Sequence, residues 1–398
     1  MAYKLTNQLE MFCGEKFTID SDKLNNYLLK FNKMMTEFID QQLIDNSNNS
    51  PNDRQLTNIS EPQLRDVGQW FKKLIDYIYR TELDIGGNNI YMYYNCMLSI
   101  DQSAPGDNDD DRRPLIQLSD DQLIALGWID QLVVIYFVMI DDIVDQSDTR
   151  FGKTCWHLLP DVGMIALNDC TLILSVVFKL AKHYFKGHPC YMDIVECIHE
   201  TIENVSIGQS MDLMNTKSTN KHAQFEQYTD NCWTTISKYK EACFAILYPF
   251  KLVMTATGQT NQKDRHIIEE CLVKCGRLTG AYNDYSDVYV KSNGTDIAEG
   301  KCSWLYVRAL EMASPEQRSV LLDNYGLGAD NHIAVDKIKL VYSQLNMKQE
   351  FCEYIGQIID SIENSCLKQL SSSTSRQLVS KIVLVYYNWL QKVYSESK

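Results

Sequence analysis

Two acidic segments carry side chains that could do chemistry together. The first, DDIVD from Asp141 to Asp145, directly follows nine consecutive apolar residues. On a helix its first and last aspartates share one face and offer hard oxygen ligands about one turn apart. These ligands suit Mg²⁺, which binds carboxylates, water and substrate phosphate oxygens. Arg150 and Lys153 follow, and such cations bind phosphate groups.

The second segment, NDYSD from Asn283 to Asp287, repeats this chemistry and is followed by Lys291 and Lys301. We expect two helices to face each other across a cavity and to hold several Mg²⁺ ions around a diphosphate. The alternatives are a patch of solvated acids at a helix end for the first segment and an ordinary polar helix face for the second. The candidate metal ligands are Asp141, Asp142, Asp145, Asn283, Asp284 and Asp287.

The elements that position these segments are predicted to be helices. Apolar residues recur every three or four positions along most of the chain, as in Leu24, Leu28 and Phe31. Gly and Pro number only 18 and 8 in 398 residues, which leaves few turns for a β fold. The aspartates from 141 to 145 should lie at the end of a helix that is otherwise buried. The sequence thus predicts an all-α protein.

Two polar stretches with Pro or Gly interrupt the helical pattern, near 46–58 and 101–114. The pattern is the same on either side of each stretch. We therefore expect exposed loops within a single domain that covers residues 1–398.

Charge and composition limit the partners and the compartment. The 38 basic and 52 acidic residues give a net charge of −14, which argues against nucleic-acid binding. The 13 cysteines are an odd number without a zinc-site pattern and indicate reduced thiols. The sequence has no signal-peptide pattern, and its longest apolar run, Leu132 to Ile140, is far shorter than the ~20 residues of a membrane span. These features predict a cytoplasmic protein without a membrane span.

From roughly Gly86 onward the chain resembles the farnesyl diphosphate synthase family of trans-isoprenyl diphosphate synthases. The resemblance rests on seven ordered motifs. They are ALGW at 125, DDIVD at 141, TRFGKTCWH at 149, IGQSMD at 207, SKYKEA at 237, NDYSD at 283 and GTDIAEGKCSW at 294.

The resemblance implies an all-α barrel of antiparallel helices around a central active-site cavity, usually in a homodimer. In this family three Mg²⁺ ions ionise an allylic diphosphate, and isopentenyl diphosphate waits in a basic pocket as the nucleophile. The allylic half is largely retained here. The positions that match catalytic or diphosphate-binding residues are Asp141, Asp145, Arg150, Gln209, Asp212, Lys240 and Lys301.

Two positions in this half depart from the family. Asn283 replaces the first aspartate of the second acidic motif, and its amide can bind Mg²⁺ but brings no charge. Glu241 replaces the threonine that follows the family's lysine, which puts the local geometry in doubt.

The isopentenyl half departs further. The family's Gly-Gly-Lys-x-x-Arg segment is GGNNIY here, with Asn88 and Tyr91 in place of the cations. Val134 replaces a glutamine, and Phe151 replaces an arginine. Each lost cation removes a contact of about 1.5–3 kcal/mol. We therefore expect no useful binding of isopentenyl diphosphate.

An enzyme that ionises an allylic diphosphate without a second substrate leaves a carbocation that cyclises, captures water or loses a proton. The sequence therefore predicts a terpene synthase, which is a lyase, most similar to the insect-type terpene synthases derived from this family. The alternatives are a chain-elongating prenyltransferase and a non-catalytic subunit of an active synthase.

Two aromatic residues bear on the substrate. Tyr136 and Phe137 lie five and four positions before Asp141, where residues of the family form the floor that limits chain length. Aromatic side chains at both positions favour farnesyl diphosphate as substrate and a sesquiterpene as product. If they are ordinary core packing, a longer substrate such as geranylgeranyl diphosphate would fit, and geranyl diphosphate is a further alternative.

Overall fold

The computed structural model describes residues 21–41, 61–79, 85–103, 114–150, 152–216, 221–259, 264–291, 295–328, 330–370 and 375–384. Most of these residues are helical, which confirms the predicted all-α class. The α-helices are α2 (Ser21–Ile39), α3 (Glu61–Tyr79), α4 (Ile85–Ser103), α5 (Asp120–Val144), α6 (Ile165–Phe185), α7 (Tyr191–Thr216), α8 (Lys221–Glu226), α9 (Asp230–Ser237), α10 (Tyr248–Ala256), α11 (Arg265–Tyr289), α12 (Asp296–Glu299), α13 (Trp304–Met312), α14 (Pro315–Asn324), α15 (His332–Gln344) and α16 (Met347–Ser361). The structure also contains a short 3₁₀ helix, η3 (Trp156–Leu158), and two π-helical segments, η4 (Lys238–Leu247) and η5 (Ile362–Leu367), and residues 375–384 are helical as well.

Helix α5 is the buried helix that the sequence predicts before the first acidic segment. It begins after Ser119, whose hydroxyl accepts a hydrogen bond from the backbone N–H of Gln122 in a reciprocal capping box. It ends at Asp145. Among the described residues it alone is long and apolar enough to cross a membrane, but 83% of its most apolar stretch is buried inside the protein. Such burial is typical of the core helix of a packed protein.

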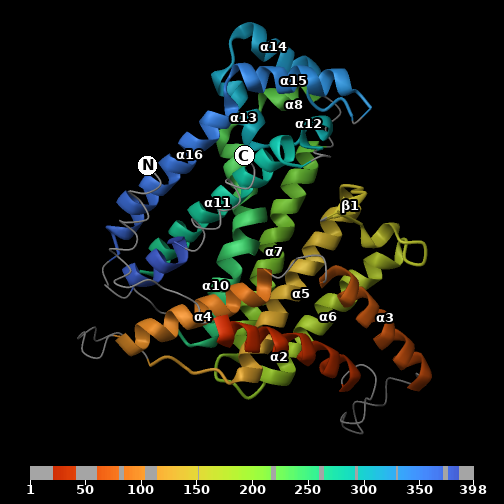
Figure 1. Ribbon diagram of the computed structural model, residues 1–398, viewed down its shortest axis with the longest axis vertical. Helices are drawn as coiled ribbons and strands as arrows, with labels where there is room; N and C mark the ends of the chain where they lie inside the picture. The colour runs from red at the N-terminus through yellow and green to blue at the C-terminus, as the bar shows by residue number, and fades with distance from the viewer. Residues whose placement is uncertain are drawn as a thin grey trace.

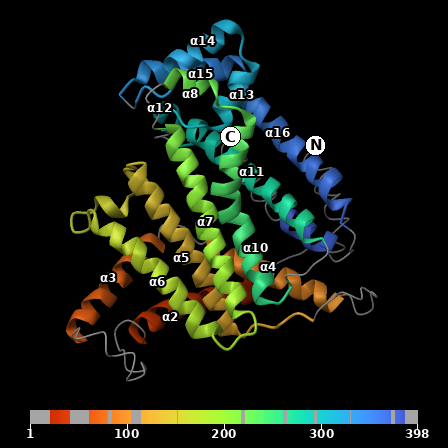
Figure 2. The same ribbon diagram turned by 180° about the vertical axis from the view of Figure 1, so that it is seen from behind.

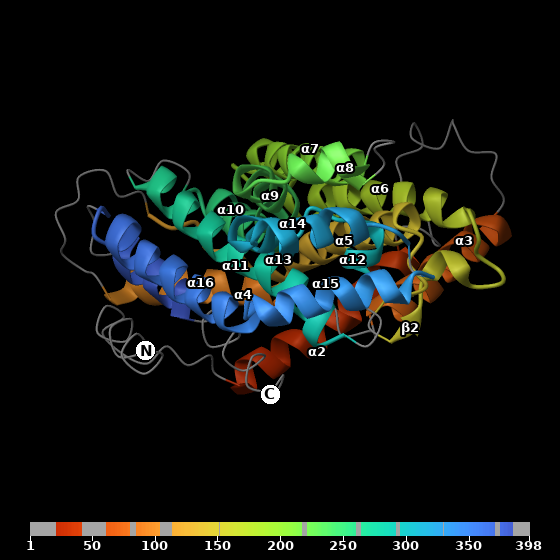
Figure 3. The ribbon, with the colours of Figure 1, turned by 90° about the horizontal axis from the view of Figure 1, so that it is seen from above.

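Helix α5 packs against other helices on several sides. Helices α4 and α6 pack along α5, while α7 packs against α10 and η4, and α11 packs against η4 (Figure 1). Helices α6 and α7 lie side by side and are joined by a short connection, so they run in opposite directions (Figure 2). Figure 3 shows α15 and α16 toward the face opposite α7. This arrangement places the end of α5 beside α7 and η4, where the candidate site lies.

A small β-hairpin, which the sequence did not predict, follows α5. Strand β1 (Thr149–Arg150) pairs antiparallel with β2 (Lys153–Thr154). Gly152 in the turn has a φ of 76°, a left-handed conformation that glycine adopts without strain. The hairpin brings Arg150 back toward the acidic end of α5.

The predicted loops fall mostly outside the described residues. Residues 46–58 and 104–113 lie outside them. Helix α4 continues to Ser103, so the second break in helical structure begins later than residue 101, where the polar composition placed it.

Asp130 in the middle of α5 is an unusual core residue. Its side chain is 1% exposed, and neither carboxyl oxygen has a hydrogen-bond partner. Burial raises the pKa of this carboxyl well above its usual value. The hydroxyl of the buried Tyr248 on α10 likewise has no hydrogen-bond partner.

We expect Asp130→Asn to stabilise the protein near neutral pH. Because the folded-state pKa is raised, the contribution of Asp130 to stability is present below its unfolded pKa of about 4 and is lost as pH rises toward the folded value. Asparagine does not ionise, so the variant should be more stable than the wild type at about pH 7, and the gain should be much smaller at about pH 4. Urea unfolding at both pH values measures this difference. An equal change at both would contradict the assignment.

Candidate active site

Two glycines allow η4 to lie unusually close to its neighbouring helices. A Cβ atom added to Gly208 on α7 would lie 2.5 Å from the backbone nitrogen of Lys240, and one added to Gly276 on α11 would lie 2.2 Å from the Cβ of Ala242. Both distances are too short for real carbon atoms, so only glycine permits this packing. The π-helical segment η4 is thus held between α7 and α11, with the backbone of Lys240 against Gly208 and Ala242 against Gly276.

Asp141 is the centre of the site. Its Oδ1 accepts hydrogen bonds from Nζ of Lys240 at 3.0 Å and from Nε2 of Gln209 at 3.2 Å. Its Oδ2 accepts a hydrogen bond from Nη2 of Arg150 at 2.9 Å. The first acidic motif, the hairpin, α7 and η4 therefore meet at one carboxylate, as the resemblance implied.

The charges around Asp141 favour its ionised form. Burial alone would raise the pKa of Asp141, but Lys240, Lys301 and Arg150 outweigh this effect and hold the pKa well below its usual value. Burial would lower the pKa of Lys240, whereas Asp212 and Asp141 raise it. At neutral pH Asp141 is therefore negatively charged and Lys240 is positively charged.

Asp212 and Asp145 extend the network. Lys240 Nζ also donates to Asp212 Oδ2 at 2.7 Å, and Lys301 Nζ donates to Asp145 Oδ2 at 2.5 Å. The Asp145 and Lys301 side chains are only 11% and 18% exposed. Lys301 lies between α12 and α13, so it reaches the first acidic motif from the part of the chain that follows the second.

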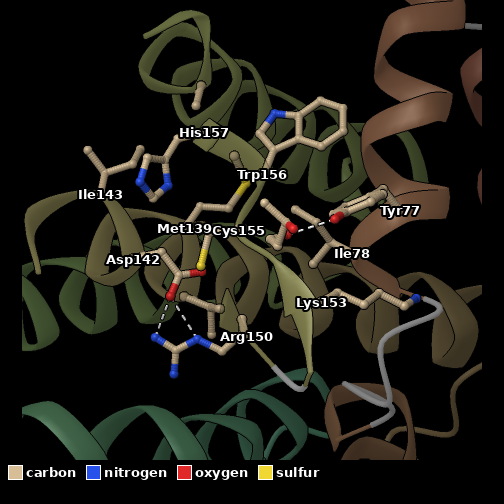
Figure 4. A pocket seen from close by; sticks show the side chains of 13 residues that line it. Tyr77, Ile78, Met139, Asp142, Ile143, Arg150, Lys153, Cys155, Trp156 and His157 are labelled. Atoms are coloured by element: carbon tan, nitrogen blue, oxygen red, sulfur yellow. Dashed lines mark hydrogen bonds and ion pairs between the residues drawn. The ribbon is translucent and has the colours of Figure 1, made fainter. Parts of the chain in front are cut away.

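Asp142 faces a different side of α5. Its Oδ1 accepts a hydrogen bond from Nε of Arg150 at 2.8 Å. Burial raises the pKa of Asp142, and Arg150 offsets part of that rise. This pair borders a small pocket between α3, α5 and the hairpin, in which Tyr77 donates a hydrogen bond to the backbone of Thr154 (Figure 4). The pairing with Arg150 places Asp142 beside the network rather than at its centre.

The second acidic motif lies on α11, as predicted, but its three side chains have different surroundings. Asn283 is exposed, and its Oδ1 accepts a hydrogen bond from Nζ of Lys291 at 3.2 Å. Asp287 is buried, and its Oδ2 accepts a hydrogen bond from the backbone N–H of Asp296 at 3.0 Å. Asp284 Oδ2 accepts hydrogen bonds from the backbone N–H of Trp304 at 2.7 Å and the indole of Trp233 at 3.0 Å. That oxygen of Asp284 thus joins α9, α11 and α13.

Two partly buried carboxyls, one in this motif and one on η4, have raised pKa values. Burial raises the pKa of Asp284 to about 8, and the hydrogen bond from Trp304 offsets only part of the rise. Burial also raises the pKa of Glu241 to about 7, although Lys240 lowers it in part. Oε2 of Glu241 is buried without a hydrogen-bond partner and would lie 3.6 Å from a Cβ atom at Gly280. Glu241 therefore points toward α11, away from Asp141.

The predicted aromatic floor lies one turn before Asp141. The rings of Tyr136 and Phe137 are 4.9 Å apart, and Phe137 also contacts Phe244 of η4 with ring centroids 6.4 Å apart. Phe244 is one turn beyond Lys240. The aromatic contacts between α5 and η4 therefore lie next to the charged network.

The donor set suits Mg²⁺. No three carboxylate, histidine or cysteine side chains in the described ranges converge on one metal position. Mg²⁺ does not need such a cage, because it keeps several waters and binds one or two carboxylates together with substrate phosphates. Asp141 and Asp145 on one helix face, with Asp287 on α11, offer such ligands.

The positions compared with the family's isopentenyl site are only partly described. Tyr91 is buried in the core, where its ring lies 4.7 Å from that of Tyr27, and Val134 is buried on α5. Asn88 belongs to α4, but its side chain and all of Phe151 lie outside the described residues. Tyr91 therefore serves packing in this chain.

Several residues of the site were not assigned from the sequence. Trp233, Trp304 and Asp296 hold the second acidic motif in place. Asp296 belongs to the GTDIAEGKCSW motif, which was the one available signal. The tryptophans bond to Asp284 across 51 and 20 residues, and such contacts have no local pattern.

The helical fold, with its acidic helix ends and buried cations, defines the isoprenoid synthase class. Residues 112–345 match the family described as Polyprenyl synthetase, and the chain belongs to this family. It is accordingly an enzyme. Magnesium dependence is a general property of the family.

Known relatives cover most of the chain. The chain is 32% identical to the farnesyl pyrophosphate synthase of Artemisia annua over 84% of its own length and 91% of the relative. It is 30% identical to that of Bos taurus over 74% of its length and 81% of the relative. The crystal structure of T. brucei farnesyl diphosphate synthase covers 91% of this chain and 98% of its own, with a TM-score of 0.71 at 22% identity. This last similarity concerns the fold.

These relatives correct the predicted function. They are named as synthases of farnesyl pyrophosphate, which are transferases, so the prediction of a terpene synthase and lyase is wrong. The inference that isopentenyl diphosphate binding is lost fails with it, as does the comparison with insect-type terpene synthases. The predicted family and the all-α fold are confirmed.

Proposed function

We propose that the chain is a prenyltransferase that joins an allylic diphosphate to isopentenyl diphosphate and releases diphosphate, with farnesyl diphosphate as its main product. The observation that carries this proposal is the convergence of Arg150 and Lys240 on Asp141, beside the Lys301–Asp145 pair. The relatives named as farnesyl pyrophosphate synthases support the same reaction.

In this proposal the basic residues hold the leaving group. As the C1–O bond of the allylic substrate breaks, negative charge accumulates on the diphosphate, and Arg150, Lys240 and Lys301 stabilise it. Asp141, Asp145, Asn283 and Asp287 would hold Mg²⁺, which when bound acts as a Lewis acid toward the diphosphate. Asp212 and Gln209 orient Lys240 and Asp141 through the contacts described above.

The test is an elongation assay. Purified protein with Mg²⁺, geranyl diphosphate and radiolabelled isopentenyl diphosphate should produce labelled farnesyl diphosphate. Omission of geranyl diphosphate is the control and should leave the label unincorporated. Absence of incorporation in the complete mixture would overturn the proposal.

Phe137→Ala should lengthen the product. Removal of the ring that contacts Phe244 opens space where the growing tail ends, so a share of the product should shift from fifteen carbons to about twenty. Chromatography of the dephosphorylated products measures this shift. Phe178→Ala on α6, a partly buried phenylalanine in the same core, is the matched control and should keep the wild-type length. An active Phe137→Ala enzyme that makes only the fifteen-carbon product would argue that Phe137 is ordinary core packing.

The substituted isopentenyl positions should weaken binding of the second substrate. The family's cations are replaced by Asn88 and Tyr91, and each lost contact is worth about 1.5–3 kcal/mol. We expect KM for isopentenyl diphosphate to exceed KM for geranyl diphosphate by about tenfold or more. Steady-state kinetics with either substrate saturating provides both values. Equal KM values would show that other residues replace the lost cations.

Other features of this enzyme are also proposals. Two acidic motifs on separate helices support three Mg²⁺ ions per active site. The family resemblance supports a homodimer and a single domain over residues 1–398. The cysteine usage supports a cytoplasmic location, and the net charge of −14 supports the absence of nucleic-acid binding.

A further inference from the structure

Two cysteines lie next to each other at the edge of the active site. Cys232 is in the first turn of α9, and Cys302 lies in the short segment between α12 and α13. Their sulfur atoms are 3.7 Å apart, although the residues are 70 positions apart in the chain. Both are free thiols. Cys302 directly follows Lys301, whose ammonium group bonds to Asp145.

We propose that Cys232 and Cys302 form a reversible disulfide on reaction with a hydroperoxide, and that this disulfide weakens diphosphate binding by displacing Lys301. The first part concerns only the two thiols. The second part rests on the proposed function, because it assigns Lys301 to the diphosphate.

The two thiols have different surroundings that suit the two steps of oxidation. Cys232 is half-buried, and the hydrogen bonds of its sulfur with Cys302 and with Nδ2 of Asn215 lower its pKa to about 7. Cys302 is 6% exposed, and its contact with Cys232 together with burial raises its pKa. A partly exposed thiolate beside a second thiol is the usual arrangement of a cysteine that reacts with peroxide.

The reaction balances without a further reagent. The Cys232 thiolate attacks one oxygen of hydrogen peroxide, the O–O bond breaks, and a sulfenic acid and water form after proton transfer. The sulfur of Cys302 then attacks the Cys232 sulfur and displaces a second water as the S–S bond forms. Two thiols are oxidised to one disulfide, and one peroxide is reduced to two waters.

Formation of this bond brings the two sulfur atoms together, and in this proposal part of the movement falls on the segment that carries Lys301. An S–S bond is about 2.05 Å long, so the sulfur atoms must approach by about 1.7 Å. The segment is fixed at both ends, because Gly300 packs against Gly326 and the Ser303 hydroxyl caps α13. A shift of Cys302 is therefore passed to Lys301, and a displaced Lys301 would lose its contact with Asp145.

Mass spectrometry tests the disulfide independently of activity. Trypsin should release residues 222–238 and 302–308 as separate peptides, each with one cysteine. After treatment with peroxide and alkylation under non-reducing conditions, we expect these peptides to be joined with loss of two hydrogens and to separate with dithiothreitol. Cys232→Ser should abolish the joined species, whereas Cys352→Ser on α16 should retain it. Failure to detect it in the wild-type protein would overturn the proposal.

Binding of inorganic diphosphate with Mg²⁺ tests the consequence for the site. Calorimetry should show affinity at least about tenfold lower for the oxidised wild-type protein, with recovery after reduction. Cys232→Ser should bind equally before and after peroxide treatment, and its elongation activity before treatment should match that of the wild type. Equal binding by reduced and disulfide-linked protein would overturn the effect on Lys301. A protein that forms the disulfide but does not elongate would contradict only the proposed function.

Discussion

Replacement of Asp141 with asparagine is expected to lower kcat by about 10³-fold. Asp141 accepts hydrogen bonds from Lys240, Arg150 and Gln209, and it is a proposed Mg²⁺ ligand. Loss of one preorganised electrostatic partner at an active site costs about 10²–10³ in rate. Asparagine removes the charge, keeps the shape, and disturbs both the cations and the metal site, so the upper end of this range is expected. The measurement is steady-state elongation at several Mg²⁺ concentrations.

The matched control is Asp121→Asn at the exposed first turn of the same helix. It makes the same chemical change far from the network, so kcat should stay within about twofold of the wild-type value. The change should affect only stability, because an exposed charge near a helix N-terminus contributes about 0.3–1 kcal/mol. The Mg²⁺ concentration for half-maximal rate should rise in Asp141→Asn. Wild-type turnover at the wild-type Mg²⁺ requirement would refute the assignment of Asp141.

Lys301→Met is expected to lower kcat by about 10²–10³-fold. Methionine keeps the apolar stem but loses the ammonium group that bonds to Asp145. The change also leaves a carboxylate with 11% exposure without its cation, so thermal stability should fall as well. Single-turnover rates, which are free of product release, measure the chemical step, and the melting temperature measures stability.

Lys291→Met is the control for Lys301→Met. It removes another lysine that follows the second acidic motif and so shows whether loss of any such lysine lowers kcat. Lys291 contacts Asp287 at 3.5 Å, and although Asp287 is buried, the lysine is 46% exposed, so solvent weakens the pair. We expect kcat to fall by less than about fivefold. If both variants lose activity equally, the buried contact between Lys301 and Asp145 is not what distinguishes the two lysines.

The sequence predicted the elements of the site well where one segment held the signal. The apolar run before Asp141 predicted a buried helix with carboxylates at its end, and α5 has this form. The contact between Asp145 and Lys301 joins residues 156 positions apart, so no periodicity could reveal it. The hairpin at Arg150 was also missed, because its strands have only two residues each.

The second acidic motif shows a different limit of sequence reasoning. Asn283, Asp284 and Asp287 have the spacing of ligands, and all three were assigned to metal. One oxygen of Asp284 instead bonds to Trp233 and to the backbone of Trp304. The sequence shows the same residue, aspartate, whether its carboxylate binds metal or holds a neighbouring helix in place. Only the positions of its partners separate the two roles.

The error about function has a related cause. The missing cations at Asn88, Tyr91 and Phe151 were treated as the loss of a substrate site, and relatives named as synthases of farnesyl pyrophosphate overturned that inference. A count of lost contacts assumes that an anion has one fixed set of partners. Binding free energy is a sum over the whole pocket, and an enzyme can retain a substrate at lower affinity.

The glycines at 208 and 276 have a consequence for how this enzyme could change over time. The backbone of Lys240 lies against Gly208 of α7, and Ala242, two residues further along η4, lies against Gly276 of α11. Substitutions at Phe137 or Phe244 can therefore alter the pocket without moving the lysine that holds the diphosphate. A selection experiment on product length should accordingly find many tolerated changes among these aromatics and almost none at the two glycines.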